Sequence, residues 1–379
     1  MHAVHTPLFA RPSLPALPID IVYLWVDGND PVWRAKRQQA ATLDAHPRMA
    51  AYANVEGRFR DNDELRYSLR ALEQFFPDHG HIYVVTDAQT PFWLADVPGI
   101  TVVHHSDLIP AAALPTFDSG HIESYIHHIP GLSERYFYLN DDVFFGAPVV
   151  LDDWFWPGGV CVSWSDEPLV SDEPLRPDAT APDNACRRSN QWLGAHPVPG
   201  YQHTFRTFAH APRPMCKSLL VALELVAPDM FTRVRSTVFR AWDKPAIVSD
   251  FVLRWALAHG QAQLREYAHQ YVCTRSADTT DALEQLVASN GQLAFFCIND
   301  TTDDALPHDP RLARVRDALQ QMFPVPSRYE LRFSTERPGQ PSRVIHYVEH
   351  QVGSHPVRQV FDQGCRVGPG GGPGNACAV

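Results

Sequence analysis

Apolar residues in this chain gather into short runs that are typical of buried strands. Six such runs occur at 19–26, 81–86, 100–105, 135–140, 160–164 and 293–298. Several are continuously apolar and do not alternate with polar residues, as expected for strands covered on both faces. Between the first two runs, Leu65, Leu69, Leu72 and Phe76 recur at helical spacing. Strand, helix, strand in this order predicts an α/β fold with a mostly parallel sheet flanked by helices.

The remaining segments differ in regularity. The patterns over 215–231, 246–259 and 309–323 favour helices, whereas residues 1–18 form a Pro-rich leader that we expect to be irregular. Residues 165–183 are acidic and Pro-rich and contain "SDEPL" twice, which predicts a mobile surface loop. The pattern fades after 335, and the glycine-rich end predicts a disordered tail over 336–379. We therefore expect one large domain over 19–335.

Composition and charge exclude several classes of protein. A formal net charge of −11 argues against a sequence-independent nucleic-acid binder, because neutralising phosphates needs a basic surface. Seven scattered cysteines without a C-x-x-C motif indicate free thiols in a reducing cytosol. No run approaches the roughly 20 apolar residues that a membrane-spanning helix needs. We expect a cytoplasmic protein, and peripheral contact with the inner face of the membrane stays open.

Acidic residues follow four of the predicted strands, in "WVDGND", "VTD", "YLNDD" and "CINDTTDD". In open α/β sheets the ligand crevice lies beyond the carboxyl ends of the strands, so these side chains are expected to converge. A divalent cation, Mg²⁺ or Mn²⁺, relieves the repulsion between such carboxylates and commonly accompanies a nucleotide diphosphate. Any one of these ends is more often a turn or a helix cap than a metal site. Four together favour a site.

Longer motifs carry a family resemblance. The segments "IDIVYLWVDGNDPVW", "RFRDNDELRYSLRALEQFF", "HIESYIHHIPGLSERYFYLNDDVFFG", "AHAPRPMCK", "FRAWDKPAIVSDF" and "FFCINDTTDD" resemble, in order, the conserved regions of the Stealth family. The resemblance covers residues 19–332. It implies a glycosyltransferase-A-like fold and transfer of a sugar 1-phosphate, of a hexose or N-acetylhexosamine such as N-acetylglucosamine, from a UDP-sugar to a glycan hydroxyl. UMP would be the leaving group, in capsular or exopolysaccharide synthesis.

The same resemblance implies four catalytic residues, Glu123, Asp142, His210 and Arg240. His210 and Asp142 are both candidates for the base that takes the proton of the acceptor hydroxyl, and we slightly favour His210 because Asp142 is suited to bind the metal. Arg240 offers a planar fork for phosphoryl oxygens, and Glu123 would hold the donor sugar or orient the acceptor. Asp141 is a second candidate metal ligand, or only a cap of the turn.

Further candidates depend on weaker signals. The loop after the first strand offers Asp27, Gly28, Asn29 and Asp30 to a nucleotide, and Trp25 could stack on the base or pack in the core. Arg66 and Arg70 could contact the pyrophosphate or form a solvated face with Asp63 and Glu73. Arg188 and Asn190 are candidates for phosphate or sugar contacts, and Asn299 and Asp300 for a second cation site or nucleotide contacts.

Two other functions compete with sugar-phosphate transfer. A metal-dependent glycosyltransferase attacked at the anomeric carbon would use the same "NDD" carboxylates and release UDP. A protein without activity could bind glycans or nucleotides only. The sequence determines neither the acceptor nor the oligomeric state, although a bacterial-type glycan is the simpler acceptor, since the long inserted modules of the animal enzymes are absent.

Overall fold

The computed structural model describes residues 18–43, 49–50, 52–306 and 308–332, together with two strands near the C-terminus. The chain divides into one compact unit ending at Glu330 and a second unit that begins at Leu331. In the second unit, β12 (His346–Val352) and β13 (His355–Phe361) form an antiparallel hairpin. This hairpin falls within the predicted tail, and the rest of 336–379 lies outside the described residues, as does the leader except for Pro18.

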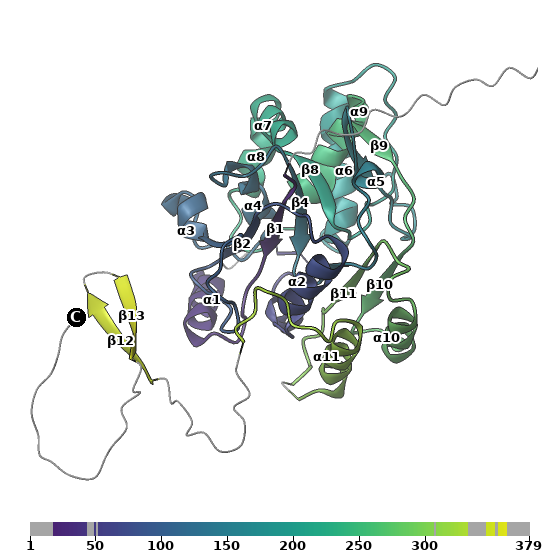
Figure 1. Ribbon diagram of the computed structural model, residues 1–379. Helices are drawn as coiled ribbons and strands as arrows, with labels where there is room; N and C mark the ends of the chain where they lie inside the picture. The colour runs from purple at the N-terminus through teal and green to yellow at the C-terminus, as the bar shows by residue number, and fades with distance from the viewer. Residues whose placement is uncertain are drawn as a thin grey trace, which may run out of the picture. The chain divides into compact units, whose positions relative to one another are not determined.

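The central sheet of the first unit has the strand order β3-β2-β1-β4-β8 (Figure 1). Its strands are β1 (Asp20–Leu24), β2 (Ile82–Thr86), β3 (Ile100–His104), β4 (Arg135–Asn140) and β8 (Arg213–Cys216). The first four are parallel and β8 is antiparallel to β4. Every residue of β1 and β2 is buried, which explains their continuously apolar sequences. The α/β class and the mostly parallel sheet are confirmed.

Two three-stranded sheets complete the strand content of the described part of this unit. One has the order β10-β11-β5 and the other the order β6-β7-β9. Their strands are β5 (Val143–Phe145), β6 (Phe155–Trp156), β7 (Gly159–Val162), β9 (Ala262–Leu264), β10 (His269–Cys273) and β11 (Phe295–Asn299). All six predicted strands are present, as β1, β2, β3, β4, β7 and β11. Apolar residues of the central sheet and of β5 and β11 share one continuous core.

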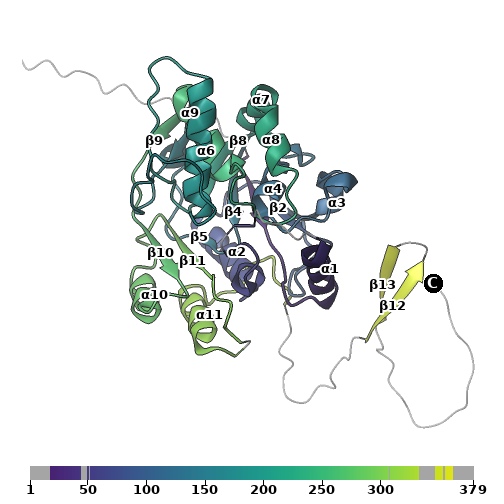
Figure 2. The same ribbon diagram turned by 180° about the vertical axis from the view of Figure 1, so that it is seen from behind.

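Helices surround these sheets (Figures 1 and 2). They are α1 (Pro31–Leu43), α2 (Glu64–Phe75), α3 (His105–Leu108), α4 (Ser119–Glu123), α5 (Leu151–Trp154), α6 (Ala181–Ala195), α7 (Lys217–Val226), α8 (Pro228–Val234), α9 (Val252–Ala258), α10 (Thr279–Ala288) and α11 (Pro310–Met322). Short 3₁₀ segments occur at Glu56–Phe59, Ala111–Ala113 and Ile126–His128, and a π-helical turn at Ile247–Phe251 leads into α9. In the part of the chain described, none of these helices combines the length and apolar character needed to cross a membrane.

The predicted helices are found with one correction. Helix α2 buries Leu65, Leu69 and Leu72 as its spacing indicates, and α9 and α11 lie within 246–259 and 309–323. The predicted helix over 215–231 is wrong at its start and in its continuity. Residues up to Cys216 belong to β8, and the helix is interrupted at Ala227 before Pro228 starts α8. Proline lacks the N–H that would continue α7, and it is favoured in the first turn of a new helix.

The topology concentrates strand ends at one place. Strand order reverses between β1 and β4, which is where ligand crevices form in open sheets. After β4 ends at Asn140, only Asp141 and Asp142 precede β5, which pairs with β11 in another sheet. The two aspartates therefore lie at the junction where the chain passes from the central sheet to its neighbour.

Candidate active site

A cavity of about 750 Å³ opens at this junction. Seven of the predicted site residues line it: Glu123, Asp141, Asp142, His210, Arg240, Asn299 and Asp300. They come from five separate parts of the sequence, so their meeting is a property of the fold. The volume lies within the range of about 300–1,000 Å³ that is usual for small-molecule sites.

Of the two adjacent aspartates, Asp142 makes more side-chain contacts with other parts of the chain. Its Oδ2 atom accepts hydrogen bonds from Asn299 Nδ2 at 3.2 Å and from Cys297 Sγ at 3.6 Å, and its Oδ1 atom lies 3.3 Å from His210 Nε2. Its main-chain oxygen accepts from Ile298 N, which ties the turn to β11. These side-chain contacts are long for hydrogen bonds to a carboxylate, which usually measure about 2.7–2.9 Å.

His210 reaches this carboxylate because of the register between β4 and β8. Tyr138 lies opposite Arg213, and in an antiparallel pair each step forward on one strand meets a step backward on the other. His210 lies three residues before Arg213 and Asp141 lies three residues after Tyr138, so both stand just beyond the paired part of the two strands. The two strands lie side by side in both views (Figures 1 and 2).

Carboxyl groups crowd this side of the cavity and resist simultaneous ionisation. Burial, with the neighbouring carboxyls of Asp142 and Glu64, raises the pKa of Asp141 well above its usual value. Burial and Asp61 also raise the pKa of Glu64 to about 8, and burial and Asp63 raise that of Asp61 to about 7. Such a group of carboxyls is electrostatically unfavourable unless a positive charge joins it.

These residues fit a hard divalent cation such as Mg²⁺. Carboxylate and amide oxygens are the ligands that such ions prefer, and Asp141, Asp142 and Asn299 supply them. The Oδ1 atom of Asn299 is buried without a hydrogen-bond partner among the described residues. Burial and the nearby Asp142 raise the pKa of Cys297 well above its usual value, so its thiol stays protonated and donates to Asp142. A thiolate ligand for a softer metal is therefore disfavoured.

Basic side chains line another part of the cavity wall. Arg240 NH2 donates to Ser119 Oγ at 2.8 Å, and its Nε atom lies 3.9 Å from Asp118. Lys244 Nζ donates to the same Asp118 carboxylate at 2.6 Å. The Arg240 guanidinium, together with burial, lowers the pKa of Arg58 to about 9. Arg240 and Lys244 thus share one carboxylate, and Arg58 adds a third cation to this part of the wall, which suits it to an anion.

Glu123 lies at the end of α4 and faces the same cavity. The Tyr138 hydroxyl is 3.0 Å from its Oε1 atom and 2.8 Å from Asn140 Oδ1. Its Oε2 atom is buried and has no hydrogen-bond partner in the described part of the chain. The Asp118 side chain begins α4 by accepting from Gly120 N at 3.0 Å. Helix α4 is therefore held at its start by the Asp118 cap and at its end by the contact of Glu123 with Tyr138.

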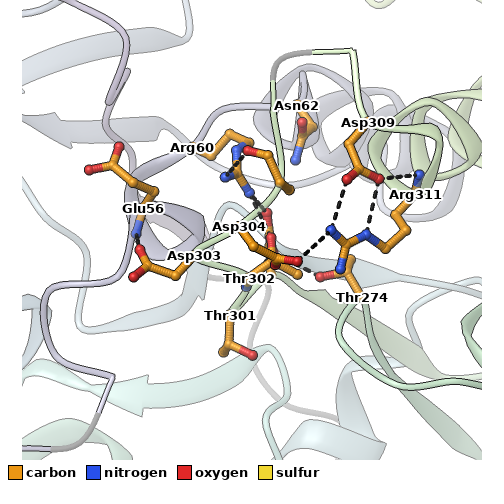
Figure 3. Close-up of polar contacts among 12 residues, drawn as sticks. Glu56, Arg60, Asn62, Thr274, Thr301, Thr302, Asp303, Asp304, Asp309 and Arg311 are labelled. Atoms are coloured by element: carbon orange, nitrogen blue, oxygen red, sulfur yellow. Dashed lines mark hydrogen bonds and ion pairs between the residues drawn. The ribbon is translucent and has the colours of Figure 1, made fainter.

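Asp300 is corrected from a metal ligand to an anchor of the loop after β11. Its Oδ1 atom accepts from Thr274 Oγ1, Thr302 N and Thr302 Oγ1 at 2.8, 2.9 and 2.7 Å. Its Oδ2 atom pairs with Arg60. Figure 3 shows Arg60, Thr274 and Thr302 around this loop, with Glu56 N bound to Asp303 further along. A carboxylate already neutralised and hydrogen-bonded by the protein has little to offer a cation.

The loop after β1 does not line the cavity. Gly28 N donates to Phe59 O at 2.7 Å, and a Cβ atom at Gly28 would lie 2.1 Å from that oxygen. The close approach that this glycine allows is thus to the main chain of Phe59. Asp27 binds Gln89 through its main chain, Asp30 Oδ1 accepts from Trp33 N at the start of α1, and Asn29 is exposed.

Arg66 and Arg70 also lie apart from the residues that line the cavity. Both pair with Glu330, Arg66 through Nε at 2.5 Å and Arg70 through Nε at 2.6 Å. Arg70 also donates to Phe323 O at 2.9 Å and is only 6% exposed. The structure therefore places Arg66 and Arg70 neither at a pyrophosphate site in the cavity nor on a solvated face with Asp63 and Glu73. They hold the segment after α11 against α2.

The remaining predicted binders are placed elsewhere. Trp25 is buried in the core. On α6, Arg188 donates to Asp243 O at 3.0 Å, while Asn190 is half-buried, and neither lines the cavity. By contrast, Arg58, Glu64, Lys244 and Arg213 line the cavity although the sequence reading did not select them. The first two belong to the motif "RFRDNDELRY", where an arginine and a glutamate flank a polar turn, which is the signal that could have found them.

The acidic segment 165–183 forms part of the cavity rim. Residues 165–180 contain neither helix nor strand, and α6 starts at Ala181. Ser171 is bound by the Arg187 guanidinium, and Val170 N donates to Phe205 O at 2.9 Å. The mobility of the segment 165–183 stays a prediction. Asp166 through Leu169 line the cavity, and Asp166 pairs with His269.

Comparison with known proteins matches three segments to conserved regions of one family. They are Stealth protein conserved region 1 at 17–42, conserved region 2 at 58–162 and conserved region 4 at 287–340. Glu123, Asp141 and Asp142 lie in the second match and Asn299 in the third. His210 and Arg240 lie between the matched segments.

Several curated proteins are similar over most of the chain. An exopolysaccharide phosphotransferase of Streptomyces coelicolor, SCO6023, is 37% identical over 85% of this chain and 54% of its own length. Another from that organism, SCO6021, is 34% identical over 83% and 57%. The exopolysaccharide phosphotransferase CpsY of Mycobacterium tuberculosis is 35% identical over 82% and 58%. The chain thus spans little more than half of the length of these relatives.

Among solved structures, a galactosyltransferase LgtC in complex with donor and acceptor sugar analogues aligns with a TM-score of 0.40 and 10% identity. It covers 81% of this chain and 98% of that one. A likeness at this level bears on neither fold nor function. The three conserved-region matches and the sequence relatives agree with each other, and on their evidence the chain belongs to the Stealth family.

Proposed function

We propose that this chain transfers a sugar 1-phosphate from a UDP-sugar to a hydroxyl group of a glycan acceptor and releases UMP. The observation that carries the proposal is one cavity with two kinds of wall. Asp141 and Asp142 face it from the end of β4, and Arg58 and Arg240 face it from other segments. A diphosphate bridged to a divalent cation needs carboxylates for the cation and guanidinium groups for its oxygens. The names of the relatives support phosphotransfer in exopolysaccharide synthesis.

The reaction requires one proton transfer. The acceptor hydroxyl oxygen attacks the β-phosphorus of the donor, the bond from that phosphorus to the bridging oxygen breaks, and UMP leaves with the electron pair. His210 takes the hydroxyl proton. Its Nε2 atom can donate to Asp142 Oδ1 at 3.3 Å, which orients the ring and leaves Nδ1 free to accept. Asp142 therefore has two uses, as a metal ligand and as the group that orients the base.

The other residues bind and stabilise. Asp141, Asp142 and Asn299 would hold Mg²⁺, or Mn²⁺, which when bound neutralises phosphate charge and polarises the phosphoryl group. Arg240 and Arg58 offer donors to the phosphoryl oxygens as negative charge spreads in the transition state. As a further part of the proposal, we place the reaction in the cytoplasm, where UDP-sugars are made, with peripheral membrane contact.

The identity of the released nucleotide tests the proposal. The full chain is incubated with UDP-N-acetylglucosamine or UDP-glucose, Mg²⁺ and a panel of bacterial glycan acceptors. The expected result is acceptor-dependent UMP release, with a phosphodiester signal in the ³¹P spectrum of the glycan. Release of UDP would instead indicate a glycosyltransferase that attacks the anomeric carbon. Binding of the donor without release of either nucleotide over the whole panel would indicate a protein that only binds.

A further inference from the structure

Arg213 is a buried cation on the cavity wall that the proposed reaction does not use. It is the first residue of β8, lies opposite Tyr138 in β4 and is only 8% exposed. Among the described residues, its guanidinium has neither a hydrogen bond nor an ion pair with another side chain. Burial lowers its pKa, and Glu123, Tyr138 and Asp250 act on it electrostatically. A buried guanidinium in such surroundings is costly unless something accepts its hydrogen bonds.

Glu123 presents the complementary feature on the same wall. It is 5% exposed and lines the cavity, and its Oε2 atom is buried without a partner among the described residues. Of the two Glu123 carboxylate oxygens, the Tyr138 hydroxyl contacts only Oε1. Arg213 and Glu123 thus attract each other electrostatically without a hydrogen bond between them. The donor fork belongs to the residue opposite Tyr138 in β8, and the unpartnered acceptor belongs to the carboxylate that the Tyr138 hydroxyl contacts.

The charge of this pair selects the chemistry of its ligand. An anionic group bound to Arg213 would also meet the Glu123 carboxylate, and a cationic group bound to Glu123 would meet Arg213. A neutral group that both donates and accepts hydrogen bonds suits the pair best, and neighbouring sugar hydroxyls do both. The position of the pair indicates which sugar. His210, where the acceptor hydroxyl must react, has a side chain that is 32% exposed. Arg213 and Glu123 are only 8% and 5% exposed, and Arg213 lies opposite Tyr138, four residues before Asp142 in the chain.

We propose that Arg213 and Glu123 together bind the hydroxyl groups of the transferred sugar while it is still attached to the nucleotide. The Arg213 guanidinium donates hydrogen bonds to sugar oxygens, and Glu123 Oε2 accepts a hydrogen bond from a sugar hydroxyl. This inference rests on the proposed function and deepens it, because it assigns a donor-sugar subsite and a specificity residue in β8. The nucleotide and its phosphates bind elsewhere in the cavity and do not depend on Arg213.

Paired titrations of the full chain with UDP-N-acetylglucosamine and with UDP, each with Mg²⁺, test the inference. Arg213→Met is expected to weaken binding of the nucleotide sugar about tenfold or more, since hydrogen bonds to a charged group are lost, and to leave UDP affinity within about twofold. Arg66→Met is the matched control, because Arg66 is an arginine outside the cavity lining, and both affinities should stay at the wild-type level. Equal losses for both ligands, or no loss for either, would overturn the subsite.

Two further variants keep the test decisive. Arg213→Lys retains the charge and loses the fork, so it should give a smaller loss that is again confined to the nucleotide sugar; if Arg213→Met does not fold, unchanged affinities in Arg213→Lys overturn the inference. A higher KM for the acceptor with normal donor affinity would assign Arg213 to the acceptor and also overturn it. The proposed function fails separately, when wild-type protein binds neither UDP nor the nucleotide sugar.

Discussion

The ends of β4 and β11 carry similar sequences, "NDD" and "NDT", yet the structure gives their aspartates opposite surroundings. At the end of β11, Asp300 receives three hydrogen bonds from Thr274 and Thr302 and an ion pair from Arg60. At the end of β4, Asp142 has only long contacts, and Asp141 beside it has a raised pKa. Asp142 and Asp300 nevertheless line the same cavity.

The difference lies in the supply of donors by the protein itself. A carboxylate that the fold has already neutralised stabilises a loop, whereas one without strong partners is left for a ligand. The basic residues divide in the same way. Arg66 and Arg70 share Glu330, while Arg240 and Lys244 share Asp118 and face the cavity with Arg58, for which the structure shows no ion pair among the described residues. Residue type alone therefore does not separate a binding residue from a structural one. The partners that the protein itself supplies to each side chain do.

Asp142→Asn should produce the largest effect. The variant removes a charged ligand and the acceptor that orients His210, so turnover should fall roughly 10³-fold or more. Stability should change little, because the substitution also removes repulsion between neighbouring carboxyls. Nucleotide release and urea unfolding measure the two quantities. A near-normal rate would show that the β4 end is no more functional than the β11 end.

His210→Ala should follow, with kcat lower on the order of 10²–10³-fold, because a base acts in the transition state. Affinity for the UDP-sugar should change much less. Steady-state rates and donor titrations separate these quantities. His79→Ala, a partly buried histidine outside the cavity lining, is the matched control. A loss of donor affinity with unchanged kcat would reassign His210 to donor binding.

Asp300→Ala should act on stability and spare the chemistry. It leaves the Arg60 guanidinium, whose side chain is 11% exposed, without its carboxylate and removes the anchor of the loop after β11. This should lower the free energy of unfolding by about 3 kcal/mol. Urea unfolding gives this value, and kcat measured on the folded fraction should stay close to wild type. A variant as stable as wild type that has lost Mg²⁺ dependence would restore Asp300 as a metal ligand.

Arg240→Lys compares the two groups of arginines directly. A lysine keeps the charge and loses the planar fork, so kcat/KM should fall roughly tenfold to a hundredfold if Arg240 holds phosphoryl oxygens. Arg66→Lys makes the same change in the pair with Glu330 and should leave kcat/KM within about twofold. Similar losses in both variants would remove the distinction between ligand-facing and structural arginines.

Features that depend on neighbouring residues could be predicted from the sequence, and features that depend on residues far apart in the chain could not. The strands were predictable because each apolar run is local, and β4 was found with its observed bounds. The contact of His210 with Asp142 spans 68 residues and depends on β8, whose last residues the sequence pattern assigned to a helix. The ion pair that neutralises the Asp300 carboxylate comes from Arg60, 240 residues away in the chain. The resemblance selected His210 and Arg240, but only the folded chain shows which carboxylates and arginines lack internal partners.

The smallest effect concerns a third strand end. After β2, Asp87 is held by Lys36 Nζ at 2.7 and 2.6 Å, and its neighbour His105 is buried at 6% exposure. Burial lowers the pKa of His105 to about 4. Between pH 6.5 and 4 the unfolded chain therefore binds a proton that the folded chain does not, so stability is complete above that range and falls as the pH drops.

From pH 7 to pH 5, the His105 contribution should lower the free energy of unfolding by about 2 kcal/mol. His105→Phe keeps a ring of similar size and cannot titrate, so its loss over the same interval should be smaller than that of wild type by this amount. Urea unfolding of both proteins at the two pH values measures the difference. Parallel pH dependence would mean that His105 protonates as readily in the folded chain as in the unfolded one. The β2 end would then resemble the β11 end, where the fold compensates a buried charge, and not the β4 end, where burial raises the pKa of Asp141.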